Sequence, residues 1–158
     1  MSLIEVVAST MIVGMMAVAA LNSLGAATRS SESIGNRAVA LGLADELMAE
    51  IMQAPYEDPT QTVAFGREAS EAASPRSAFD DVDDYDGWNR NPPQYHDGTV
   101  MSERASWRHR VEVHRVAPGN PTQTVASDQG CKRIQVFIEY NDQVLAEQTV
   151  IRTNTDEE

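Results

Sequence analysis

A run of acidic residues between Phe79 and Trp88 is the densest group of potential metal ligands in the sequence. It holds five aspartates in seven residues: Asp80, Asp81, Asp83, Asp84 and Asp86. Carboxylate oxygens are the ligands that a hard cation such as calcium takes in proteins. The run does not fit the EF-hand loop, because aligning Gly87 with the invariant glycine of that loop puts Pro93 where its glutamate belongs. We therefore favour a solvated acidic turn anchored by Phe79, Tyr85 and Trp88, with calcium binding as the alternative.

The histidines and the single cysteine form no other recognisable centre. His109 and His114 lie five residues apart in a predicted strand, so their side chains point to opposite faces. A lone cysteine, Cys131, excludes an internal disulfide framework and a multi-cysteine zinc site. The sequence contains no phosphate loop, dinucleotide fingerprint or nucleophile elbow. We therefore predict that the protein is not an enzyme and needs no cofactor.

Charge is distributed very unevenly along the chain. The 158 residues include 12 Lys and Arg against 24 Asp and Glu, a formal net charge of -12. Residues 1–28 contain one ionisable side chain, that of Glu5, and residues 29–158 hold all the others. An acidic balance without a basic stripe argues against nucleic acid as a partner.

The apolar N-terminal segment is long enough to cross a membrane. Residues 6–28 carry no charge, and as a helix they span roughly 35 Å against a bilayer core of about 30 Å. A cleaved secretory signal would be shorter and would begin with basic residues. Because Arg29 and Arg37 follow the segment, the positive-inside rule places the acidic part in the cytoplasm unless a basic leader has been removed before Met1.

Glu5 is the exception within this segment. A carboxylate in an apolar helix costs about 2.5–3.5 kcal/mol near the bilayer centre and less near its edge. The function of a simple membrane anchor does not require a carboxylate at this position. An anionic side chain at a helix start does interact favourably with the helix dipole, which is the alternative explanation for Glu5.

The first residues carry a family resemblance. The stretch 1–8, MSLIEVVA, resembles the mature start of type IV pilins and type II secretion pseudopilins. Segments 44–59 and 79–87 are also similar to minor pilin-like proteins of the mannose-sensitive haemagglutinin pilus biogenesis group. The resemblance implies that a prepilin peptidase removes a short basic leader and N-methylates Met1. It also implies that Glu5 pairs with the methylated amine of a neighbouring subunit, since a buried carboxylate needs a cationic partner.

A helical pattern continues beyond the apolar segment. Apolar residues recur at helical spacing at Ile34, Ala38, Leu41, Met48 and Ile51. Pro55 ends the pattern, so we expect one helix over residues 2–53 whose second half packs on a sheet. A membrane anchor with a coiled-coil stalk is the alternative.

The C-terminal third reads as antiparallel β-structure. Strands are expected at 107–116, 133–140 and 144–152, from their alternation and their β-branched residues. Asn141 and Asp142 predict a hairpin turn between the last two strands. The expected fold is α+β and pilin-like, with a long N-terminal helix and a small sheet. Its parts are a transmembrane or filament-core helix at 1–28 and a head at 29–158, the head comprising an amphipathic helix at 29–54, a loop region at 55–106 and strands at 107–152.

The resemblance implies a structural function. We expect a minor pilin or pseudopilin, a subunit of a type IV pilus or type II secretion filament. It would reside in the inner membrane with its head on the periplasmic side, and then enter a periplasmic or extracellular filament. Its partners would be other pilin subunits, the prepilin peptidase, the inner-membrane assembly platform and lipid. The alternative is a single-pass membrane-anchored binding module, with calcium as one possible ligand.

Overall fold

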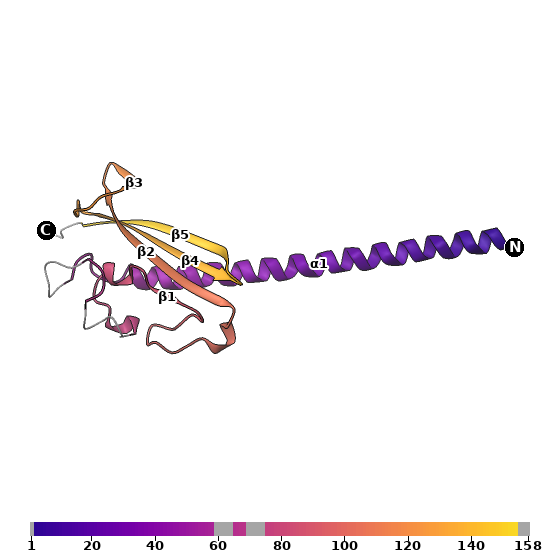
Figure 1. The fold of residues 1–158 in the computed structure, drawn as a ribbon, viewed down its shortest axis with the longest axis horizontal. Helices are drawn as coiled ribbons and strands as arrows, with labels where there is room; N and C mark the ends of the chain where they lie inside the picture. The colour runs from indigo at the N-terminus through magenta and orange to yellow at the C-terminus, as the bar shows by residue number, and fades with distance from the viewer. Residues whose placement is uncertain (1, 59–64, 69–74, 155–158) are drawn as a thin grey trace. The chain divides into compact units, whose positions relative to one another are not determined.

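The computed structural model describes residues 2–58, 65–68 and 75–154 (Figure 1). The chain divides into two compact units, Met1–Ala38 and Val39–Glu158. The single α-helix of the described residues, α1 (Leu3–Ile51), contributes to both units. The prediction of a long N-terminal helix followed by a small antiparallel sheet is confirmed, and the fold class is α+β.

The first unit is an α-helical segment whose apolar side chains face outward. Leu3, Ile4 and Leu21 are 85%, 74% and 69% exposed. By length and composition the helix could cross a membrane, and no residue of its most apolar stretch is buried. The hydroxyl groups of Ser9, Thr10 and Thr28 donate to backbone carbonyls one turn earlier, as Ser9 Oγ does to Glu5 O over 2.7 Å. Such bonding allows hydroxyl side chains to sit in an apolar helix.

The second unit contains an antiparallel sheet. Its strands are β1 (Asn89–Arg90), β2 (Trp107–Ala117), β3 (Asn120–Thr124), β4 (Cys131–Tyr140) and β5 (Gln143–Thr153). Their order is β1-β2-β4-β5, and β3 pairs with one end of β2. The 3-10 helices η1 (Arg76–Ala78), η2 (Asp83–Tyr85) and η3 (Ser102–Arg104) lie in the preceding loop region. The three predicted strands are therefore confirmed, and β1 and β3 extend the sheet.

The hairpin between β4 and β5 is also confirmed. Asn141 and Asp142 have φ angles of 49° and 61°. Positive φ at both central positions is the requirement of the tight hairpin turn, and Asn and Asp tolerate it better than most residues. The register that follows pairs Ile134 with Val150 and Ile138 with Ala146, so these apolar residues share one face of the sheet.

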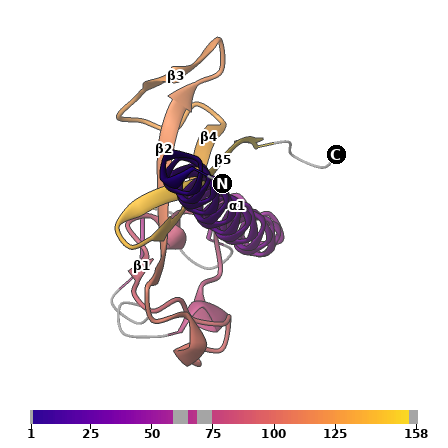
Figure 2. The same cartoon turned by 90° about the vertical axis from the view of Figure 1, so that its right-hand side faces the viewer.

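The C-terminal part of α1 packs on that face of the sheet (Figures 1 and 2). The buried residues of α1 are Ala40, Leu43, Ala44, Leu47, Met48 and Ile51. They join strand residues Val111, Val113, Ile134, Val136 and Ile138 in one hydrophobic core. Fully burying a Val, Leu, Ile or Met side chain contributes about 1.5–3 kcal/mol, so this layer accounts for much of the stability of the unit.

The predicted apolar stripe of this helix is partly wrong. Met48 and Ile51 are buried, but Ile34 and Leu41 are 68% and 50% exposed, and Ala38 is exposed as well. The helix is rotated so that the small side chains of Ala40 and Ala44 face the core. Small residues there let the helix backbone approach the sheet, whereas counting only large apolar residues selects the neighbouring stripe.

Candidate functional site

The N-terminal motif forms a local hydrogen bond at the start of α1. Glu5 Oε2 accepts a hydrogen bond from the backbone N–H of Ser2 over 2.8 Å. The bond satisfies one of the N–H groups that a first helical turn leaves without an intrahelical acceptor. The Glu5 side chain is exposed in the isolated chain. Met1, the predicted site of methylation, lies outside the described residues.

The acidic run folds into a compact turn that is largely buried. Asp81, Asp83 and Asp84 are only 4%, 3% and 1% exposed. The prediction of a solvated turn is therefore wrong, although its aromatic anchors Tyr85 and Trp88 are indeed buried. Burial became possible because the backbone and one lysine supply partners for the carboxylates.

Backbone N–H groups bond the carboxylates of the turn. Asp84 Oδ2 accepts from the N–H groups of Asp80 and Asp81 over 2.9 and 3.1 Å. Asp81 Oδ1 in turn accepts from the N–H of Asp83 over 2.6 Å. Asp86 Oδ1 accepts from the N–H of Val113 on β2 over 2.9 Å, which ties the turn to the sheet.

Lys132 on β4 supplies the countercharge. Its side chain is 1% exposed, and its ammonium donates to Asp83 Oδ1 and to the backbone oxygen of Tyr56. Burial and the neighbouring charges of Asp83 and Asp84 raise the pKa of Asp81 to about 7. In the part of the chain that the structure describes, no group of three or more His, Cys, Asp or Glu residues could hold a metal ion. The predicted calcium ligands Asp80, Asp81, Asp83, Asp84 and Asp86 thus act as internal hydrogen-bond acceptors or lie beside them.

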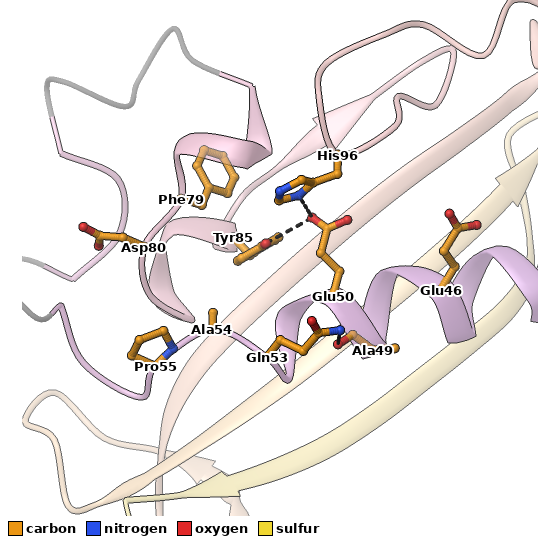
Figure 3. Close-up of a pocket in the computed structure, with 10 residues that line it drawn as sticks. All are labelled: Glu46, Ala49, Glu50, Gln53, Ala54, Pro55, Phe79, Asp80, Tyr85 and His96. Carbon is orange, nitrogen blue, oxygen red and sulfur yellow. Dashed lines mark hydrogen bonds and ion pairs between the residues drawn. The ribbon is translucent and has the colours of Figure 1, made fainter.

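A cleft of about 640 Å³ lies within the second unit, between the last turns of α1 and the loop region (Figure 3). Its floor is formed by residues of α1 and the segment after it: Glu46, Ala49, Glu50, Gln53, Ala54 and Pro55. Its walls are Phe79, Asp80, Tyr85 and His96. The lining combines three carboxylates with apolar and aromatic side chains.

Glu50 is the centre of the polar network beneath this cleft. Its oxygens accept from Arg76 Nε over 2.6 Å and from Arg76 Nη2 over 3.0 Å. Tyr85 Oη donates to Glu50 Oε1 over 3.0 Å, and His96 Nδ1 lies 3.1 Å from the same oxygen. Burial would raise the pKa of Glu50, but Arg76, His96 and Tyr85 together lower it below its ordinary value. Glu50 therefore stays ionised at the edge of the core.

Arg76 is itself held in place from several sides. It is 5% exposed, and its guanidinium lies 4.4 Å from the ring centroid of Trp88. Its Nη1 also donates to the backbone oxygen of Gln94 over 2.9 Å. A bidentate arginine–carboxylate pair of this kind is rigid and directional, so it fixes α1 to the loop region.

The loop that carries His96 has a backbone requirement of its own. Gly98 has a φ of 86°, and a Cβ added there would lie 2.9 Å from Pro75 Cβ. The N–H of Ser77 donates to His96 O over 3.0 Å. Glycine is thus needed to close this loop onto η1, which places the imidazole of His96 over Glu50.

A second histidine near the network is buried without a polar partner. His109 on β2 is 2% exposed, and within the described chain neither ring nitrogen has a hydrogen-bond partner. Its ring lies 5.9 Å from that of Trp88. Burial, together with the charge of Arg76, lowers the pKa of His109 to about 4. The ring is therefore neutral at pH 7. His114 on the same strand is half-buried, consistent with the predicted opposite faces.

Sequence reasoning did not find the Glu50 network. Glu50, Arg76, Tyr85 and His96 come from four separate stretches of the chain, and no local spacing marks them. The one available signal was a glutamate near the end of an amphipathic helix, which is ordinarily read as a solvated side chain.

No family model, curated protein or solved structure matches the chain.

Proposed function

We propose that this protein is a minor pilin or pseudopilin, a structural subunit of a type IV pilus or type II secretion filament. The observation that carries the proposal is the N-terminal helix, which follows Ser2, begins Leu-Ile-Glu and presents apolar side chains on all sides. That motif precedes a unit with its own core, in which the later part of α1 packs on an antiparallel sheet.

The exposed apolar side chains of this helix support a location first in the lipid bilayer and then in a protein assembly. Its apolar stretch has no buried residue within the unit. Such a surface must be covered by a bilayer or by other helices. An α-helix satisfies its backbone polar groups internally, so it suits either setting. A filament core of packed N-terminal helices would cover it after release from the membrane.

Glu5 distinguishes a filament subunit from a simple anchor. In the isolated chain its carboxylate accepts one local hydrogen bond, which leaves it able to accept more. In an apolar assembly it would pair with the N-methylated amine of Met1 on a neighbouring subunit. This pairing gives a reason for the energetic cost of a carboxylate in the helix.

The proposal includes the processing and the location of the protein. A prepilin peptidase would cut a basic leader and methylate Met1. Before cleavage, the positive charge of the leader would keep that end of the helix on the cytoplasmic side of the membrane. The head would then lie in the periplasm, and the inner-membrane assembly platform would move the subunit into a filament. No catalytic step is assigned to the chain itself.

Mass spectrometry of the native N-terminus tests the proposal. We expect a first residue Met1 that carries a methyl group on its amine. A chain that keeps upstream residues and an unmethylated amine would exclude it. A Glu5→Ala variant should remain membrane-bound and folded but should enter filaments less well, while the matched variant Glu32→Ala on the same helix should enter normally.

A second candidate is a membrane-anchored binding module, and the cleft over Glu50 favours it. The cleft has room for a ligand, and three carboxylates line it. Such a protein would retain its anchor and would bind ligand without forming filaments. A normal filament yield in cells that lack the protein, with loss of a binding phenotype, would favour this candidate.

A further inference from the structure

One carboxylate that lines the cleft has no partner among the described residues. Glu46 lies one helical turn before Glu50, and the two side chains extend to the same side of α1 (Figure 3). Glu50 is neutralised by Arg76. Glu46 is exposed and forms no hydrogen bond or ion pair with any described residue. The cleft therefore presents a negative charge at Glu46 that no described residue of the second unit neutralises.

Two small residues flank Glu46 on the surface of α1. Gly42 and Ala49 lie at i−4 and i+3 from Glu46, on the same face of α1. Both residues are exposed, and a Cβ added at Gly42 would meet no atom within 4 Å. Small residues permit a second helix to approach an α-helix closely, so this face could accept a helix as well as a single side chain.

Two arginines of the chain have no partner within the described structure. Every other lysine or arginine of the described residues forms a hydrogen bond, an ion pair or a ring contact. Arg29 and Arg37 form none, and both are exposed. Ser33 lies between them at i+4 from Arg29, so a small side chain separates the two arginines on one helix face.

We propose that the cleft binds the Arg29–Arg37 segment of a second copy of this chain, with one of the two guanidinium groups paired to Glu46. The inference rests on the proposed filament function, in which copies pack through their N-terminal helices. Free cations on one segment and a free carboxylate on another surface give charge complementarity between copies. Small residues on both sides, Gly42 and Ala49 against Ser33, let the two helices approach closely.

The chemistry of the cleft favours a guanidinium over a metal ion. Its carboxylates are spread along the cleft, and no three of the described acidic or histidine residues converge as metal ligands. A guanidinium has a planar set of several N–H donors and an apolar stem. It can pair with Glu46 while its stem lies against the side chain of Ala49.

Site-directed cross-linking in membranes tests the contact. Two differently tagged full-length copies, one with Gly42→Cys and one with Ser33→Cys, are co-expressed in a Cys131→Ser background and oxidised. We expect a disulfide-linked pair that contains both tags. Adding Arg29→Glu and Arg37→Glu to the Ser33→Cys copy should lower its yield by roughly fivefold, the effect of an exposed ion pair of about 1 kcal/mol. Adding Glu46→Arg to the other copy should restore the yield.

Two controls separate this inference from the proposed function. Glu103→Arg reverses an exposed acid on η3, outside the cleft, and should neither lower nor restore the yield. Met15→Cys in one copy and Leu24→Cys in the other lie five helical turns before Ser33 and Gly42 with the same offset, so this pair reports packing of the N-terminal helices alone. If the Met15–Leu24 pair links but the Gly42–Ser33 pair does not, or does so regardless of charge, the inference is wrong and the filament proposal stands. If neither pair links, copies of this chain are not neighbours and the inference fails, while methylation of Met1 decides the filament proposal.

Discussion

Lowering the pH should destabilise the head by protonating His109. The ring is 2% exposed and neither nitrogen has a hydrogen-bond partner in the described chain. Burial, with Arg76 and Arg104 nearby, lowers the pKa of His109 from 6.5 to about 4. A histidine with a lowered pKa in the folded state contributes its full stability above the unfolded pKa. It loses that stability as the pH falls from about 6.5 to about 4.

The size of the effect follows from the shift. A difference of about 2.5 pKa units corresponds to about 3.4 kcal/mol when the ring is fully protonated. At about pH 5, His109 is mostly protonated in the unfolded chain but not in the folded chain, and the free energy of unfolding is lower by about 2 kcal/mol. The His109→Phe variant keeps a ring against Trp88 and cannot be protonated, so this loss should be absent from it.

The assay is urea unfolding of the full chain in a non-ionic detergent, followed by the fluorescence of Trp88 and Trp107, both buried. The free energy of unfolding of the native protein relative to His109→Phe should fall by about 2 kcal/mol between about pH 7.5 and pH 5. His114→Phe, on the other face of β2, is the matched control: because it keeps His109, its free energy of unfolding relative to His109→Phe should show the same fall. An equal difference between the native and His109→Phe proteins at both pH values would show that His109 is not the source of the loss.

The remaining predictions concern packing and charge in the same unit. Lys132→Met should lower the free energy of unfolding by about 3–5 kcal/mol, because it leaves Asp83 buried without its partner. Adding Asp83→Leu should restore most of that free energy, as measured by urea unfolding. Asp81 has a raised pKa, so its folded-state contribution becomes more favourable as the pH falls from about 7 to about 4. Asp81→Asn should remove that trend from a stability-versus-pH profile. Leu47→Ala should lower the free energy of unfolding by about 2–5 kcal/mol, whereas Leu41→Ala should change it by no more than about 0.5 kcal/mol. Thermal melting measures both, and equal effects would show that the buried face of α1 is misassigned.

The elements of the fold were predictable because their signals are local. The alternation of apolar and polar residues set β2, β4 and β5 to within a few residues, and Asn141–Asp142 marked the hairpin. Each signal depends on side chains a few positions apart and on backbone preferences of single residues. The apolar N-terminal segment was equally plain, because the absence of charge over its length needs no tertiary information.

The face of α1 that packs on the sheet was harder to predict. Two apolar stripes run along the helix, and the larger residues Ile34 and Leu41 favour the wrong one. The sheet selects the stripe that contains Ala40 and Ala44, because close approach of backbones requires small side chains. Periodicity predicts that one face of a helix is buried, whereas shape decides which face it is.

Sequence alone therefore determined the long apolar helix, the antiparallel strands, the hairpin and the position of Glu5 in its motif. The environment of the charged residues depends on the tertiary structure: it buries Asp83 against Lys132 and places Arg76 on Glu50, and it leaves Glu46 at the cleft with no partner among the described residues. Local patterns depend on neighbours along the chain, but a buried charge depends on partners from distant segments. Only folding brings Arg76 and His96 within hydrogen-bond distance of Glu50, so no spacing in the sequence predicts this network.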